Sequence, residues 1–152
     1  MPQEQQPALD TAAVDPVEFA RHIASTSDND LATAMRSEGR SLVLDEVFAR
    51  MERHFLADRA RGVEAIIHWR IGDRPDGGHD VYEVVIREGA CRLSEQPLAD
   101  PGLTFTVGAV DFLRLVTGGR QGPMMFMRGR LKVVGDLPLA ARMTSLFSIP
   151  SA

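Results

Sequence analysis

The chain has 152 residues, of which 44% are apolar and 25% charged, and its formal net charge is -4. This length supports one domain with its own core, and the composition excludes a disordered chain. The acidic balance argues against nucleic acid as a partner, and against an anionic membrane surface as the main partner, because both favour a basic protein. Cys91 is the single cysteine, so no internal disulfide is expected, which fits a reducing cytoplasm.

The N-terminal segment predicts a flexible leader followed by short helices. Residues 1–14 are rich in Gln, Pro and Ala and have neither the basic segment nor the apolar run of a signal peptide. Asp15 and Pro16 supply the cap and first position of one helix, and Ser27 opens a second. We treat residues 15–40 as an N-terminal helical extension. No apolar run is long enough to span a bilayer, so a soluble protein is expected.

The third helix is the clearest in the chain and opens the main domain, residues 41–152. Ser41 opens this helix, which ends before Gly62. Its apolar residues recur at helical spacing against a charged opposite side, and they are Leu44, Val47, Phe48, Met51 and Phe55.

Beyond Gly62 the hydrophobic period changes from helical to alternating, which predicts strands. Strands are expected at residues 63–70, 81–89, 90–94 and 103–107, separated by turns rich in Gly, Pro and Asp. These four strands predict an antiparallel meander. Helices are expected at residues 109–117, 123–127 and 136–147, with a last strand at 129–134. The mixed order predicts an α+β fold with helices on one face of a sheet.

Residues with catalytic or metal-binding chemistry do not converge in the sequence. The four histidines are scattered, and neither HExxH nor CxxC occurs. Cys91 lies in an expected strand without a helix N-terminus beside it, which favours a small strand hydrophobe over a nucleophile. His68 lies on the strand face opposite Trp69 and is expected to face solvent. We therefore expect no enzymatic activity, no cofactor and no metal.

Flexible apolar side chains gather near the C-terminal end of the chain. They are Met124, Met125, Phe126, Met127, Met143, Leu146 and Phe147. Because methionine adapts to irregular gaps, core filling and a deformable pocket wall both explain this cluster, and the pattern does not separate the two. Arg128 and Arg130 form a solvated face or, alternatively, hold a carboxylate or phosphate at a pocket mouth.

Four blocks of the C-terminal half resemble the sterol carrier protein 2 family. They are VYEVVIREGA, VDFLRLVTGG, MMFM and GRLKVVGDLPLAARMTSLF. The last block is the most specific, because the family combines a glycine, a basic strand residue, a Gly-Asp pair and an apolar helix, here Gly129, Lys132, Gly135-Asp136 and Leu139 to Phe147. The similarity runs from about Phe48 to Phe147. The helices before Ser41 resemble an extension seen in bacterial single-domain relatives.

The resemblance implies a five-stranded, mainly antiparallel sheet with helices packed on one face that enclose an apolar tunnel. It also implies non-catalytic binding or transfer of a sterol, fatty acid, fatty acyl-CoA or phospholipid. The peroxisomal C-terminal tripeptide of the family is missing, which favours a bacterial cytoplasm. The candidate ligand-binding residues share apolar-face positions, and they are Phe48, Met51, Phe55, Phe105, Phe112, Met124, Met125, Phe126, Met143 and Phe147.

An empty rigid tunnel is not expected in such a small domain. A cavity of roughly 500 Å³, left empty at about 24 cal/mol per Å³, costs about 12 kcal/mol, which is comparable with the stability of a whole domain. We expect either bound lipid or a C-terminal helix that folds over the gap. The alternative function is a protein interaction or dimerisation module without lipid cargo. The oligomeric state stays open, as does a transient contact with a membrane or an enzyme.

Overall fold

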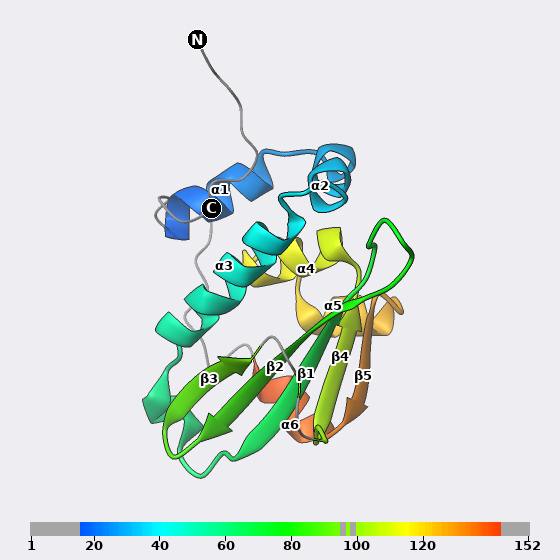
Figure 1. Cartoon of the computed structure of the whole chain (residues 1–152). Coiled ribbons are helices and arrows are strands. Elements are labelled where there is room, and N and C mark those ends of the chain that lie inside the picture. The colour runs from blue at the N-terminus through cyan, green and yellow to red at the C-terminus, as the bar shows by residue number, and fades with distance from the viewer. Residues whose placement is uncertain (1–15, 95–96, 98–99, 144–152) are drawn as a thin grey trace.

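The computed structural model describes residues 16–94, 97 and 100–143, and its elements follow the expected order (Figure 1). The strands are β1 (Ala65–Ile71), β2 (Asp80–Arg87), β3 (Ala90–Ser94), β4 (Leu103–Val107) and β5 (Leu131–Gly135). The helices are α1 (Pro16–Ala24), α2 (Asp28–Met35), α3 (Arg40–Arg53), the 3-10 helix η1 (Ala57–Ala60), α4 (Ala109–Val116), α5 (Gly122–Met127) and α6 (Leu137–Arg142).

The five strands form one sheet in the order β3-β2-β1-β4-β5. β1 pairs parallel with β4, and the other pairings, β1 with β2, β2 with β3 and β4 with β5, are antiparallel. The five-stranded, mainly antiparallel sheet is therefore confirmed, but the expected meander ends at β3. Alternation fixes which residues of a strand face the core and leaves its partner open. Here the β1–β4 pairing sets Trp69 beside Phe105 on the buried face.

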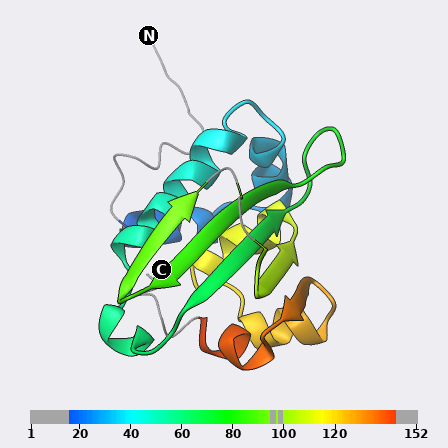
Figure 2. The same cartoon turned by 60° about the horizontal axis from the view of Figure 1, so that its bottom comes forward.

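Helices α3 and α4 lie against one face of the sheet, and α1 and α2 pack on α4 beyond them, while α5 and α6 contact β5 at the sheet edge (Figures 1 and 2). The strands alternate accordingly, as β4 shows: Leu103, Phe105 and Val107 are buried, and the two intervening threonines are half-buried. This alternation is the one that the sequence predicts. The α+β class is thus confirmed.

Helices α1 and α2 share the core of the rest of the chain. Phe19 and Ile23 of α1 are buried in it, as are Leu31 and Met35 of α2. Arg114 of α4 donates a hydrogen bond to the Ile23 carbonyl and so fixes the end of α1. The apolar faces of both helices therefore pack inward.

Both ends of α3 differ from the predictions. α3 begins at Arg40, one residue before the expected Ser41, because the Arg40 guanidinium is anchored inside the protein. α3 ends at Arg53, and η1 follows in place of the last expected turns. The final helix, expected to reach Phe147, is described as far as Arg142, and residues 144–152 lie outside the described part. No described helix has the length and apolar content to cross a membrane.

Candidate functional site

The space between the sheet and the helices holds an aromatic cluster that includes three predicted ligand-binding residues. Phe48 of α3 stacks on Tyr82 of β2, with ring centroids 4.2 Å apart, and on Phe112 of α4 at 5.2 Å. Phe105 of β4 stacks on Trp69 of β1 at 4.4 Å. All five rings are buried. A ligand that enters the position of these rings would therefore have to displace them.

Trp69 carries a buried indole Nε1–H with no hydrogen-bond partner among the described residues. Burying a donor without an acceptor costs about 1–3 kcal/mol, and such groups are rare in native proteins. An acceptor oxygen delivered to this point would remove that cost. The alternation of β1 predicts that Trp69 faces inward, but nothing in the sequence signals the unpaired N–H.

Four further predicted residues surround the aromatic cluster. Met51 and Phe55 are partly buried against the core, and Met125 of α5 and Met143 after α6 are buried in it. These side chains thus belong to the same core as the stacked rings. Phe147 lies outside the described residues.

Helix α5 exposes most of its apolar side chains. Met124 is 50% exposed, Phe126 49% and Met127 80%. The helix has six residues with a proline in its first turn, and the side that packs on β5 buries Met125. Large apolar groups gathered on an exposed element mark interaction or ligand sites. Met124 and Phe126 therefore lie at the surface, unlike the other described candidates.

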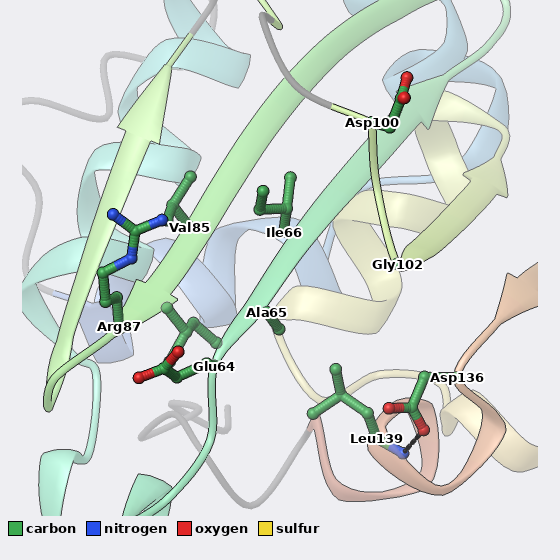
Figure 3. A pocket seen from close by; sticks show the side chains of 10 residues that line it. Glu64, Ala65, Ile66, Val85, Arg87, Asp100, Gly102, Asp136 and Leu139 are labelled. Atoms are coloured by element: carbon green, nitrogen blue, oxygen red, sulfur yellow. Dashed lines mark hydrogen bonds between the residues drawn. The ribbon is translucent and has the colours of Figure 1, made fainter.

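A cavity of about 280 Å³ lies beside α6, on the face of the sheet that points away from α3 and α4. Figure 3 views the sheet from this face, with the helices behind the strands. Its lining is Glu64, Ala65, Ile66, Val85, Ile86, Arg87, Asp100, Gly102, Asp136 and Leu139. Ile66 and Val85 are cross-strand neighbours and form an apolar floor. None of the predicted residues lines this cavity. The sequence did contain a signal for this cavity. Ile66 and Val85 are apolar, although they lie on the strand face where the alternating pattern predicts polar residues.

His68 and Glu83 form a pair on this same face. Nε2 of His68 lies 3.1 Å from Oε2 of Glu83, and the two side chains are 15% and 6% exposed. His68 thus lies opposite Trp69, as the alternation predicts, but it is largely buried because it pairs across β1 and β2. No third ligand joins them, since the described residues contain no group of three or more His, Cys, Asp or Glu placed to hold a metal ion.

Cys91 of β3 is held in its protonated form. Burial, and secondarily the nearby Glu52 carboxylate, raise the pKa of the Cys91 thiol from 9.0 to about 12. The thiolate is the reactive form of cysteine, so this environment suppresses nucleophilic chemistry. The interpretation of Cys91 as a small strand hydrophobe is favoured.

Alkylation kinetics test this assignment. With a pKa of about 12, the thiolate fraction near neutral pH is roughly a thousandfold below that of an ordinary thiol, because each pKa unit is tenfold. We expect iodoacetamide to modify native Cys91 at least about a hundredfold more slowly than Cys91 of the chain unfolded in guanidinium chloride. Similar rates in the two states would contradict the assignment.

The model of the SCP-2 sterol transfer family matches residues 44–148, which run from within α3 beyond α6. The chain belongs to this family. The match covers the sheet, the aromatic cluster and α4 to α6, and it leaves α1 and α2 outside. Membership of the SCP-2 family supports a general role in lipid binding or transfer.

Curated relatives of this SCP-2 chain include sterol carrier protein 2 of Homo sapiens, 25% identical over 116 residues, which are 75% of this chain and 21% of that protein. Sterol carrier protein 2 of Rattus norvegicus is 24% identical over 106 residues, which are 70% of this chain and 19% of that protein. The chain therefore spans about a fifth of the length of these relatives.

Solved structures show the same fold. The sec-alkylsulfatase from Pseudomonas sp. aligns with a TM-score of 0.62 at 17% identity, over 72% of this chain and 17% of the enzyme. Sterol carrier protein 2 like 2 from Aedes aegypti gives 0.52 at 18% identity, over 72% of this chain and 100% of that one. Apo sterol carrier protein 2 from Yarrowia lipolytica gives 0.51 at 22% identity, over 59% and 71%. The first of these is an enzyme, so the fold also occurs within a catalytic protein.

Proposed function

We propose that this chain binds a hydrophobic small molecule, a sterol, fatty acid, fatty acyl-CoA or phospholipid, and carries it without chemical change. The observation that carries the proposal is the exposed apolar side of α5 in a chain of the SCP-2 sterol transfer family. Met124 and Phe126 lose their remaining contact with water when they close over an acyl chain or a sterol. Burial of apolar area is the main driving force for such binding.

The packing of the aromatic cluster implies that α5 and α6 move when the ligand enters. The rings of the aromatic cluster stack on one another between the sheet and the helices, and Leu139 and Met143 are buried. Such packing avoids the cost of an empty cavity at the positions that these side chains fill. Because α5 and α6 contact the edge strand β5 and its neighbour, they can separate from the sheet without breaking the central β1–β2 pairing.

The unpaired Trp69 N–H supports a ligand that carries an oxygen acceptor. A carboxylate, an ester carbonyl or a sterol hydroxyl accepts a hydrogen bond from Nε1, whereas a plain hydrocarbon leaves this donor unpaired. Of two ligands with equal apolar area, the one with the acceptor is therefore favoured.

Binding without catalysis is supported by the chemistry of the interior. The Tyr82 hydroxyl already donates to Asp45, at 2.6 Å, and the other rings of the cluster offer neither a nucleophile nor a general base. The protonated Cys91 thiol lacks the reactivity of a thiolate.

A matched pair of substitutions tests the role of α5. Phe126→Asp places a charge where the ligand is expected to pack, and Leu42→Asp places the same charge on α3 at a residue that is 62% exposed. Loss of one apolar anchor of about 1.5–3 kcal/mol predicts a Kd for palmitic acid raised roughly 10- to 100-fold in Phe126→Asp. Leu42→Asp is expected to bind as the unmodified chain does. Isothermal titration calorimetry measures both affinities.

Circular dichroism must show that both variants are folded, which their surface positions favour. A folded Phe126→Asp with unchanged affinity would remove α5 from the binding site. Organic extraction of the purified chain, followed by mass spectrometry, tests the proposal itself. Absence of extracted lipid, together with no heat of binding and no rise in melting temperature with palmitic acid, would overturn it.

A further inference from the structure

The exposed apolar residues of α5 continue directly into a basic turn. We call Met124, Phe126, Met127, Arg128 and Arg130 the α5 surface, and every one of these five residues is exposed. Arg130 lies 3.7 Å from Asp111, and no acidic partner of Arg128 is present among the described residues. Figure 2 shows α5, β5 and α6 together at one side of the molecule, so the α5 surface lies at an accessible edge.

The charge of this region is opposite to that of the whole chain. Residues 120–142 contain five basic and one acidic residue, which gives +4, against -4 for all 152 residues. The rest of the chain therefore carries -8. Arg120 is already held by Asp111 and Asp28, and Arg142 after β5 donates to the Arg59 carbonyl. Arg128, Arg130 and Lys132 are the other three basic residues of this segment, and all three are exposed. A local basic surface thus exists on an acidic protein.

We propose that the α5 surface docks on an anionic phospholipid bilayer. Met124, Phe126 and Met127 enter the boundary between headgroups and acyl chains, while Arg128 and Arg130 contact lipid phosphates. Apolar side chains beside arginines are the composition by which peripheral segments bind such interfaces. Docking goes beyond the proposed function, because it specifies the surface at which cargo is exchanged.

The composition of the α5 surface favours a bilayer over other partners. The arginines could contact the phosphates of a nucleic acid. The three large apolar side chains would have few contacts there, because proteins bind nucleic acid mainly through phosphates and base edges. Two of the three apolar side chains are methionines, whose flexibility suits a fluid interface. The acidic remainder of the chain is repelled by anionic lipid, so it orients the α5 surface toward the membrane.

Vesicle sedimentation with the full chain tests the proposal. Vesicles of mixed phosphatidylcholine and phosphatidylglycerol are expected to bind the chain, and vesicles of phosphatidylcholine alone to bind it much more weakly. Binding should fall steeply at ~1 M salt, where the screening length is about 3 Å. In Arg128→Gln/Arg130→Gln the partition coefficient is expected to drop roughly 30-fold, because each basic side chain at an anionic surface contributes about a factor of five. Met127→Asp is expected to reduce binding as well.

The matched control is Arg61→Gln/Arg92→Gln, which removes the same charge from exposed positions, one before β1 and one on β3, the edge opposite β5. It should bind anionic vesicles as the unmodified chain does. Equal loss in the two double variants, or binding that ignores lipid charge, would overturn the proposal. So would a dimer seen by light scattering that Met127→Asp dissociates, because the surface would then join two copies of the chain.

Palmitic acid titration without vesicles separates docking from ligand binding. Arg128→Gln/Arg130→Gln should keep the ligand affinity of the unmodified chain while losing vesicle binding. A lower palmitic acid affinity in this variant would overturn the docking role and would show that the arginines hold the ligand carboxylate. If the chain binds vesicles but no palmitic acid, docking stands and the proposed function fails.

Discussion

Replacement of Arg40 by methionine is expected to lower the free energy of unfolding by about 3–5 kcal/mol. Arg40 is 5% exposed. Its Nε donates to Asp80 at 2.7 Å, its Nη2 to the carbonyls of Ile71 and Gly72 at 2.8 Å each, and its Nη1 to the Met35 carbonyl at 3.2 Å. Methionine keeps the apolar stem but has no donor, so these oxygens lose their partner inside the protein. Urea denaturation measures the loss.

Arg74→Met is the matched control for Arg40→Met. Arg74 also donates to Asp80, at 3.1 Å, but its side chain is 39% exposed. Exposed ion pairs contribute little, so a loss below about 1 kcal/mol is expected for this variant. Similar losses in the two variants would show that Arg40 acts as a surface charge and that its backbone contacts carry no stability.

The hydrogen bonds of Arg40 show why some contacts of the fold cannot be predicted from the sequence. The pattern predicts the helix from Ser41 because local caps and spacing determine where helices begin. The three carbonyls that hold Arg40 come from the end of α2 and from the end of β1. Such contacts between distant segments leave no local signal, and arginine is a residue that is usually exposed.

Local periodicity predicts the elements themselves well, since each buried face follows from spacing. The alternation of β4 and the apolar stripe of α3 are both observed. The parallel pairing of β4 with β1 is not encoded in either strand alone, because many strands present the same alternating faces. Fold class was therefore predictable from the residues, while the order of the strands was not.

The candidate site was harder to predict than the fold. Phe48 and Phe126 look alike in sequence, as aromatic residues among other apolar ones, yet Phe48 is buried and Phe126 is half-exposed. The difference arises because α3 packs across the sheet, whereas the short α5 contacts the edge strand β5. The hydrophobicity of a side chain predicts that it will be buried where it can be. Whether it is buried depends on how much surface the neighbouring elements place against it.

Gly135→Ala is expected to destabilise the fold by about 3–5 kcal/mol and to displace α6. Gly135 has a φ of 113°, a conformation that L side chains rarely adopt. A Cβ there would lie 2.2 Å from the carbonyl oxygen of Gly102. Gly102 cannot yield easily, because its N–H donates to Ile66 and its oxygen accepts from Asp136. Asp136 caps α6 through the Leu139 N–H, at 3.0 Å, so relief of the clash moves the helix.

Gly129→Ala separates the two causes of this destabilisation. Gly129 also has a positive φ, of 74°, but a Cβ there meets no atom within 4 Å. Backbone strain alone predicts a loss of about 1–2 kcal/mol, so the excess in Gly135→Ala measures the clash with Gly102. Thermal and urea unfolding give both values, and palmitic acid titration of folded Gly135→Ala reports whether displacement of α6 alters the site. An equal loss of stability in Gly135→Ala and Gly129→Ala would contradict the close approach of Gly135 to Gly102. It would also show that the position of α6 does not depend on this approach.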